Sequence, residues 1–383
     1  MGQHKTVWDN PAEVIRHLSP EQPVMAFAPT VLQERARQFL DGFPGLVTYA
    51  VKANPEEAVI QNLVAAGLGG FDVASPFEID LIGRVAPGTA RHYHNPVRAR
   101  SEIAHAVAQG IRAWSVDSRS KLDKLFEQVP SEMDGVGVEI SPRFKLPVPG
   151  AAYDFGSKFG ATPERAAELL AEVARRGYVA SLTFHPGTQC ADPVAWERYI
   201  RAARAICDMA GVRPRRLNVG GGFPLHRAIG AEPDLKAIFA RIADTTAAMF
   251  GNNAPTLVCE PGRGICADAC ALITCIKGIR DDGAVFLNDG VYGGLSELPI
   301  IGNIDRIVVL TPQGKPRRGG PIGRVIFGPT CDSVDRLPGE LGLPADAVEG
   351  DYVIFHGAGA YSTVTNTRFN GFGALTHATV MNL

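Results

Sequence analysis

The segment Tyr49-Ala50-Val51-Lys52-Ala53-Asn54 puts a lysine where its amine could do chemistry. Leu46–Val51 is apolar and β-prone, as expected of a buried strand, and a helical pattern follows from Glu56 to Ala66. At the carboxyl end of such a strand, loss of water disfavours the ammonium form of Lys52 and favours the neutral amine. A neutral lysine can form an imine with an aldehyde cofactor. The alternative is a strand-end lysine whose amine simply reaches solvent.

A run of glycines could bind an anion. Gly220-Gly221-Gly222-Phe223 follows the apolar strand Leu217–Val219. Successive glycines leave backbone N–H groups free to point at an anion such as phosphate. A tight turn between a strand and a loop is the alternative.

Two further strand ends carry groups suited to a flat, charged cofactor. In Cys259-Glu260-Pro261-Gly262-Arg263, the carboxylate could bind a ring nitrogen and the guanidinium a phosphate, or the two could form a structural ion pair. In Phe184-His185-Pro186-Gly187-Thr188, the imidazole could stack on an aromatic cofactor or be an ordinary core histidine.

Three other positions have structural and chemical interpretations. Ser75-Pro76-Phe77-Glu78 matches a helix capping box, and Asp72 is either a cap or a partner of Lys52. In Gly328-Pro329-Thr330-Cys331-Asp332, a thiol beside a carboxylate could be a proton donor next to a receptor for a cation, or a buried cysteine beside a turn aspartate.

The elements that must position these residues alternate between apolar strands and amphipathic helices. Eight strands are predicted to end near Lys52, Asp72, Asn95, Asp117, Ile140, His185, Gly220 and Glu260. Eight such units over residues 29–263 are typical of a (β/α)8 barrel, whose active site lies where its strands end. The polar residues above gather at those ends.

The pattern changes after Arg263. Short β-prone runs separated by Gly, Pro and Asp predict a second, mostly antiparallel β-domain built from residues 1–28 and 264–383.

Composition excludes several classes of function. The net charge of −2 argues against a nucleic-acid or polybasic membrane surface, and no apolar run reaches the roughly 20 residues of a membrane span. Seven cysteines without framework spacing, and a polar N-terminus without a signal-peptide core, predict a reduced, cytoplasmic protein. Cys266, Cys270 and Cys275 lack the spacing of a zinc site, so no metal is expected.

Taken together and in this order, the motifs resemble those of the fold-type III pyridoxal-phosphate decarboxylases of basic amino acids, which share the alanine racemase-like fold. That group includes the ornithine, lysine and diaminopimelate decarboxylases, and the similarity is greatest to bacterial ornithine or lysine decarboxylases. The resemblance covers about residues 23–375. Besides the motifs already given, it is carried by Phe71-Asp72-Val73-Ala74-Ser75, Gly359-Ala360-Tyr361, Phe369-Asn370-Gly371-Phe372 and the extension of the cysteine motif to Asp335.

This resemblance implies roles for the cofactor residues. Lys52 would form the imine with pyridoxal 5'-phosphate, His185 would stack on its ring, and Glu260 would keep the ring nitrogen protonated, which makes the ring a better electron sink. The remaining cofactor-binding residues would be Asp72, Thr188, Gly221, Gly222, Gly262, Arg263 and Tyr361, with Thr188, Gly222, Arg263 and Tyr361 at the phosphate.

It also implies a homodimer that decarboxylates a small basic amino acid, ornithine or alternatively lysine, to a polyamine-type amine and CO2. Cys331 would protonate Cα, and Asp332 would bind the distal amine, both in the site of the partner subunit. Glu297 is placed as a second carboxylate for that amine, and Phe369 as a further substrate contact.

Two departures keep other substrates open. Where the family carries Arg in a run like Leu-Arg-Ile, this chain reads Val138-Glu139-Ile140, and the Tyr-Asp pair that eukaryotic ornithine decarboxylases place after Asp-Gly-Val-Tyr-Gly is missing. Diaminopimelate, carboxynorspermidine or a larger conjugated amino acid of a siderophore or antibiotic pathway are therefore alternatives. So are an amino-acid racemase, although such racemases carry Arg in place of Glu260, and an inactive regulator, although Lys52, Glu260 and Cys331 are intact.

Overall fold

The computed structural model describes residues 6–147, 156–227 and 232–383. The chain forms two compact units. The barrel unit comprises Ala36–Pro224 and Pro233–Gly262, and the β unit comprises Met1–Arg35, Leu225–Glu232 and Arg263–Leu383.

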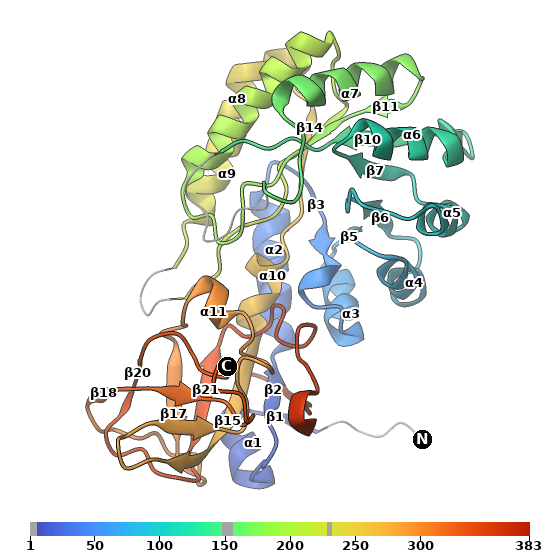
Figure 1. Ribbon diagram of the computed structural model, residues 1–383. Coiled ribbons are helices and arrows are strands. Elements are labelled where there is room, and N and C mark those ends of the chain that lie inside the picture. Colours follow the sequence, from blue (N-terminus) through green and yellow to red (C-terminus); the bar gives the residue numbers. More distant parts are fainter. Residues whose placement is uncertain (1–5, 148–155, 228–231) are drawn as a thin grey trace. The chain divides into compact units, whose positions relative to one another are not determined.

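The barrel unit is built around eight parallel strand segments (Figure 1). In chain order these are β3 (Gly45–Val47) with β4 (Tyr49–Ala50), β5 (Gly70–Val73), β6 (Ala90–Tyr93), β7 (Ala113–Val116), β10 (Glu139–Pro142), β11 (Val179–Ala180) with β12 (Leu182–Thr183), β13 (Arg216–Asn218) and β14 (Thr256–Cys259). The first segment closes the ring, because β3 pairs with β14 while β4 pairs with β5. A bridge between Arg143 and Thr183 continues the ring beyond β10. The predicted (β/α)8 barrel is confirmed.

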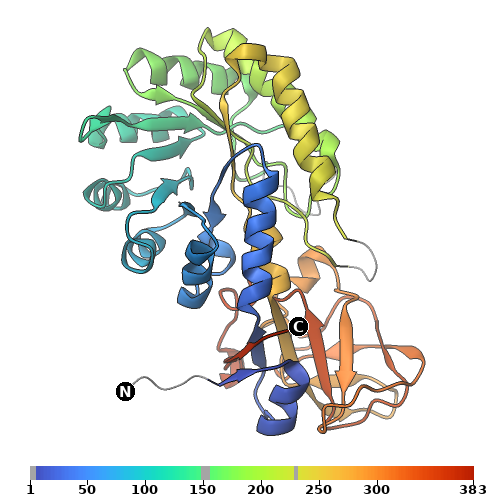
Figure 2. The ribbon, with the colours of Figure 1, turned by 180° about the vertical axis from the view of Figure 1, so that it is seen from behind.

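Amphipathic helices cover the outside of these strands (Figure 2). They are α2 (Pro29–Gly42), α3 (Glu57–Ala65), α4 (Pro76–Val85), α5 (Arg100–Ala108), α6 (Arg119–Gln128), α7 (Pro163–Arg175), α8 (Pro193–Ala210) and α9 (Leu235–Phe250). Half of the predicted capping box is present at the start of α4: the cap Ser75 accepts a hydrogen bond at Oγ from the Glu78 N–H. Glu78 Oε2 accepts a hydrogen bond of 2.6 Å from the Ala74 N–H, one residue before the cap, and not from the cap N–H as predicted. A short antiparallel pair, β8 (Glu132–Met133) and β9 (Val136–Gly137), precedes β10.

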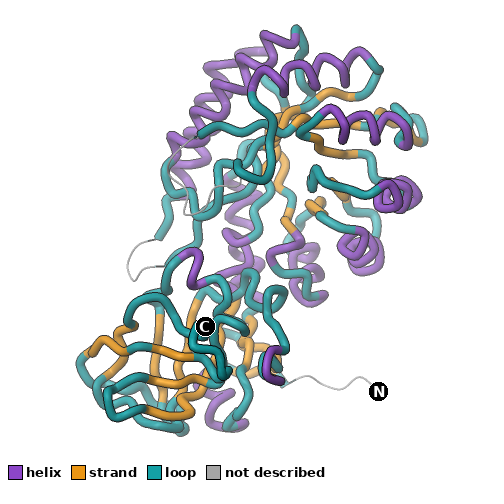
Figure 3. The backbone as a smooth tube through the Cα atoms, in the orientation of Figure 1, coloured by secondary structure: helices purple, strands orange, loops and turns teal. Residues whose placement is uncertain are grey.

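The β unit consists mainly of strands and loops (Figure 3). Its longest strand, β15 (Cys270–Ile279), runs antiparallel to β2 (Val24–Phe27), β16 (Val285–Leu287) and β21 (Tyr352–His356). The other strands are β1 (Val7–Trp8), β17 (Ile307–Leu310), β18 (Pro321–Arg324), β19 (Ile326–Phe327), β20 (Leu341–Pro344) and β22 (Thr376–Val380). Strand β21 also pairs antiparallel with β17, and β18 pairs antiparallel with β20. Only the pairings of β22 with β1 and β2, and of β16 with β19, are parallel among the described residues. The unit is therefore mostly antiparallel, as predicted.

The β unit also holds short helices that position loops. These are α1 (Pro11–Leu18), α10 (Arg263–Cys266) and α11 (Leu298–Ile301). Among the helices of the described residues, none is long and apolar enough to cross a membrane.

Candidate active site

A cavity of about 180 Å³ lies at the carboxyl ends of the barrel strands. It is lined by Lys52, Asp72, Ala74, His94, Asn95, Pro96, Arg143, Phe159, Thr183, Phe184, His185 and Glu260. Four of the residues singled out from the sequence thus meet at one place: Lys52, Asp72, His185 and Glu260. Parallel strands bring their carboxyl ends to the same edge, which is why residues more than 200 positions apart converge here.

Lys52 lies in a single 3-10 turn, Val51–Ala53, between β4 and α3. The residue is exposed rather than buried, so the expectation that desolvation favours its neutral amine is wrong for this structure. The reason is local, because the turn ends the strand before Lys52 and carries the side chain to the open edge of the barrel. Burial is the largest effect on the pKa values of Asp72 and Glu260, and it raises both. The positive charge of Lys52 is a smaller effect that acts in the opposite direction on both groups.

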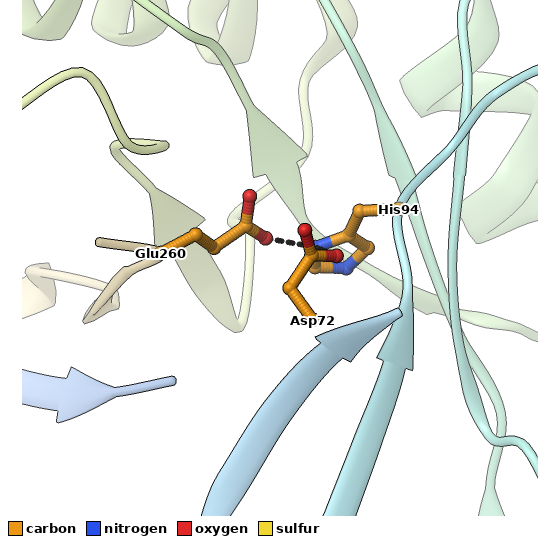
Figure 4. Close-up of side chains that lie close together, drawn as sticks. All are labelled: Asp72, His94 and Glu260. Carbon is orange, nitrogen blue, oxygen red and sulfur yellow. Dashed lines mark hydrogen bonds and ion pairs between the residues drawn. The ribbon is translucent and has the colours of Figure 1, made fainter. Parts of the chain in front are cut away.

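Three buried side chains form a cluster beside the lysine (Figure 4). His94, at the end of β6, is hydrogen-bonded through Nδ1 to Glu260 Oε1, and the same nitrogen lies 3.9 Å from Asp72 Oδ1. Asn218, at the end of β13, donates a hydrogen bond from Nδ2 to the same Oε1 of Glu260. Polar atoms of Asp72, His94 and Glu260 all lie within 4.8 Å of one another.

In this cluster the pKa values of Asp72 and His94 are raised and that of Glu260 is lowered. Burial raises the pKa of Asp72, and repulsion from Glu260 adds to the effect. Burial also opposes the charged form of Glu260, but the charge and hydrogen bond of His94 outweigh it and lower the pKa of Glu260. For His94, burial is outweighed by the two carboxylates, so its pKa is raised. The favoured state is a His94 cation paired with a Glu260 anion, with Asp72 the easier carboxylate to protonate.

His185 contributes a neutral imidazole to the cavity wall. Burial, followed by the charges of Arg143 and Lys52, lowers its pKa well below the ordinary value. Its Nδ1 accepts a hydrogen bond of 3.1 Å from the Gly187 N–H. Gly221 packs against the ring, since a Cβ there would lie 3.2 Å from Nε2 and 2.6 Å from the Glu260 carbonyl oxygen.

The other glycines of the predicted site keep the loops close together and do not line the cavity. Gly222 has φ of +85°, and a Cβ on it would meet the Gly187 carbonyl oxygen at 2.0 Å. A Cβ on Gly262 would lie 2.8 Å from Ala53 Cβ, beside the turn of Lys52. Thr188 is half-buried in the loop after β12 and also lies outside the cavity lining. These glycines therefore let backbone approach backbone around the site.

The structure shows where Glu139, which stands at the family's arginine position, lies relative to the cavity. Glu139 is the first residue of β10, not the last, and its carboxylate pairs with Arg216 at 3.1 Å. Four residues later, Arg143 lines the cavity, with its guanidinium 5.1 Å from the centre of the Phe159 ring. The residue that directly follows β10 is therefore an arginine that lines the site.

Two residues of the β unit that are expected to hold phosphate, Arg263 and Tyr361, contact each other in the structure. Arg263, at the start of α10, is buried and bound by both carboxylate oxygens of Glu297. Its guanidinium also lies 4.9 Å from the centre of the Tyr361 ring. Tyr361 has φ of +66°, a conformation that few residues other than glycine adopt. Glu297, expected to bind substrate, is instead held by Arg263 within this unit.

The residues expected to act on the substrate lie on loops of the β unit. Cys331 is exposed, and its N–H donates to Asn370 Oδ1 at 3.0 Å. Asp332 Oδ2 accepts a hydrogen bond of 2.6 Å from the Tyr292 hydroxyl, and the Tyr292 ring lies 5.0 Å from that of Phe369. Phe369 is 42% exposed. In this unit an exposed thiol and an exposed aromatic ring thus lie near a half-buried acid and a half-buried tyrosine.

The sequence alone missed three residues of the site, of which His94 and Arg143 line the cavity and Asn218 does not. His94 and Asn218 directly contact Glu260, and Arg143 lines the same wall. A signal existed for His94, because a polar residue at a predicted strand end next to Asn95 fits the rule that located the others.

An amine, a flat neutral imidazole and a buried carboxylate around one cavity define an enzyme site suited to an aldehyde cofactor with a basic aromatic ring. Comparison with known proteins agrees. Residues 30–267 match the family described as the pyridoxal-binding domain of pyridoxal-dependent decarboxylases. The lysine/ornithine decarboxylase of Selenomonas ruminantium is 32% identical over 335 residues, 85% of this chain and 81% of that protein.

Solved structures are similar over nearly the whole chain. The arginine decarboxylase of Paramecium bursaria Chlorella virus, bound to agmatine, has a TM-score of 0.84 and 26% identity, covering 96% of this chain and 99% of its own. The lysine/ornithine decarboxylase of Vibrio vulnificus with cadaverine has a TM-score of 0.81 and 26% identity, covering 97% and 99%. The chain belongs to the fold-type III, pyridoxal-phosphate-dependent decarboxylases of basic amino acids.

Proposed function

We propose that this enzyme removes CO2 from ornithine, with lysine as the alternative substrate, and releases the corresponding diamine. The observation that carries the proposal is the convergence of Lys52, His185 and Glu260 on one cavity at the barrel's active edge. Family membership supports the reaction, and the acid at Asp332 supports a substrate with a distal amine.

The donor set of the cavity fits pyridoxal 5'-phosphate. Lys52 offers the primary amine that can condense with its aldehyde, His185 a flat neutral ring that can stack on the pyridine, and Glu260 an anion for the ring nitrogen. When bound, the pyridinium ring supplies the electron sink for the pair released as the carboxylate leaves. In the proposed site, Thr188, Gly222, Arg263 and Tyr361 would hold the phosphate, Gly221 and Gly262 would also contact the cofactor, and Asp72 would lie beside Lys52.

The chain's own residues then orient groups and move protons. Glu260, kept ionised by His94, favours the protonated ring nitrogen. Lys52 would hold the cofactor at its aldehyde group, and its amine, when free, would act as a base or proton donor near the substrate. Cys331 carries the thiol proton that is delivered to Cα after CO2 departs. Asp332 accepts hydrogen bonds from the substrate's distal ammonium, and Phe369 covers its apolar stem.

We also propose a homodimer in which Cys331, Asp332 and Phe369 complete the site of the other subunit. Cys331 and Phe369 are exposed in the single chain and Asp332 is half-buried, so all three side chains are at least partly accessible to another subunit. We assign the enzyme to the cytoplasm, because none of its seven cysteines, all among the described residues, forms a disulfide.

A larger or differently charged substrate is the second candidate. Glu297, the one extra carboxylate expected for the distal amine, is bound by Arg263, and the Tyr-Asp pair is absent. Fewer acids for the distal amine fit diaminopimelate, whose distal amine is paired with its own carboxylate, or a conjugated amino acid, and carboxynorspermidine is the further alternative from the same family.

A CO2-release screen tests these assignments. Purified enzyme with pyridoxal 5'-phosphate is incubated with carboxyl-labelled ornithine, lysine, arginine, diaminopimelate and carboxynorspermidine, and kcat/KM is compared. We expect ornithine or lysine to give the highest value. Release only from a larger substrate would favour the second candidate, and racemised amino acid without CO2 would overturn decarboxylation.

A further inference from the structure

His94 is assigned no role by the motifs of the family resemblance, yet it contacts the carboxylate that faces the cofactor (Figure 4). Its ring is buried, with 8% of the residue exposed, and its backbone is fixed because the Ser115 hydroxyl donates to the His94 carbonyl oxygen at 2.6 Å. A side chain held this firmly beside Glu260 is positioned to control that residue.

The hydrogen bonds treat the two oxygens of Glu260 differently. His94 Nδ1 and Asn218 Nδ2 both bind Oε1. Among the described residues, no hydrogen bond engages Oε2, which leaves that oxygen for another partner. Asn218 is itself fixed, because its Oδ1 accepts a 2.9 Å hydrogen bond from the Gly220 N–H. Two donors on one oxygen therefore fix the rotation of the carboxylate.

The charges around His94 favour its cationic form. Glu260 and Asp72 face it from β14 and β5, and Glu139 acts from β10. His92, two residues earlier on the same strand, has its ring centre 5.4 Å away, and burial followed by the charge of His94 lowers its pKa to about 3. Lys52 and Arg143 are the further cations whose charges act on both carboxylates. The neutral His92 does not oppose a charge on His94.

We propose that His94 is a positioning residue that keeps Glu260 ionised and turned with Oε2 toward the ring nitrogen of the cofactor. Two buried carboxylates this close compete for one proton, and a cation bonded to Glu260 directs that proton to Asp72 instead. The inference rests on the proposed function, because it requires the cofactor ring in this cavity.

The test uses the holoenzyme and two variants, His94→Gln and His94→Ala. Glutamine keeps a hydrogen-bond donor but not the charge, and it also covers the case in which the alanine variant fails to fold. Readouts are the pH profile of kcat/KM and, without substrate, the pH dependence of the bound cofactor's absorption. His105→Gln, on exposed helix α5 and paired with Asp80, is the matched control.

We expect the acid limb of both pH profiles to move to higher pH by about one unit or more in His94→Gln and His94→Ala, since losing the cation raises the pKa of Glu260. The value of kcat should fall about 10- to 100-fold, with KM within about threefold and partial recovery in His94→Gln. His105→Gln should match the wild type.

An unshifted profile in His94→Gln overturns the inference, whether or not kcat falls, because a purely structural loss does not move the titration of Glu260. That result would leave the proposed function intact. Failure of the wild-type protein to bind the cofactor or release CO2 would instead overturn the proposed function itself.

Discussion

Glu297 holds Arg263 in a fork, with each carboxylate oxygen bound to a different Nη atom. The guanidinium is buried and also lies over the Tyr361 ring, so two side chains of the β unit hold this cation. A bidentate pair sets the plane of the guanidinium as well as its place. Glu297 therefore acts on Arg263 before it can act on any substrate.

This pair separates two roles for Glu297. If it orients Arg263, Glu297→Gln should weaken binding of pyridoxal 5'-phosphate about tenfold and leave KM for the amino acid within about threefold, because one charged hydrogen-bond pair is lost. Equilibrium dialysis or quenching of protein fluorescence measures the cofactor. A higher KM with unchanged cofactor affinity would return Glu297 to the substrate site.

Asp332 should control substrate affinity through its charge. Asp332→Asn removes the anion for the distal ammonium, so KM should rise about 10- to 100-fold while cofactor binding is unchanged. Tyr292→Phe removes only the 2.6 Å hydrogen bond that orients Asp332, and we expect a smaller rise, about threefold. Steady-state kinetics measures both, and a cofactor defect in Asp332→Asn would argue against a substrate role.

The Glu139–Arg216 pair should matter for stability and not for catalysis. Glu139 is buried, and removing one partner of a buried pair leaves an uncompensated charge, so Glu139→Ala should lower the free energy of unfolding by about 3 kcal/mol. Denaturant unfolding measures this loss. Cofactor affinity and kcat/KM of the folded variant should stay within about threefold, and a large change in either would link Glu139 to the cavity.

Asp289 makes the stability of the β unit depend on pH. Burial raises its pKa from 3.8 to about 6, even though the Gly290 and Gly294 N–H groups donate to it. Between these values the folded state binds the proton more than the unfolded state, so the free energy of unfolding falls as the pH rises from about 4 to 6.

Asp289→Asn removes that titration. The difference in unfolding free energy between variant and wild type should move in the variant's favour by about 3 kcal/mol from pH 4 to pH 7. Denaturant titrations at the two pH values give this difference directly. A difference independent of pH would contradict the buried, raised carboxyl group.

Local signals carried most of the fold. Apolar strands followed by polar ends located all eight barrel segments. Helix α1 was not predicted, although Asn10 caps it and Pro11 begins it.

The sequence predicted only those site residues whose own type and motif indicate a chemical role. His94 and Glu260 are 166 positions apart, and their contact depends on strand register around the closed barrel. Glu139 begins β10 and Arg143 directly follows its last residue, and four residues of strand span about 13 Å, so Arg143 lines the cavity whereas Glu139 pairs with Arg216 outside the cavity lining. No spacing rule in the sequence predicts how far along the barrel strands each of these residues lies.

Covalent capture of the cofactor tests the central claim most directly. Purified enzyme loaded with pyridoxal 5'-phosphate is reduced with borohydride, digested and analysed by mass spectrometry, alongside Lys52→Ala and the control Lys315→Ala, an exposed loop lysine. We predict a single pyridoxyl adduct on the Lys52 peptide in the wild type and in Lys315→Ala, with loss of the adduct and of the visible absorption band in Lys52→Ala. An adduct on another lysine in the wild type, or a band that persists in Lys52→Ala, would contradict the account.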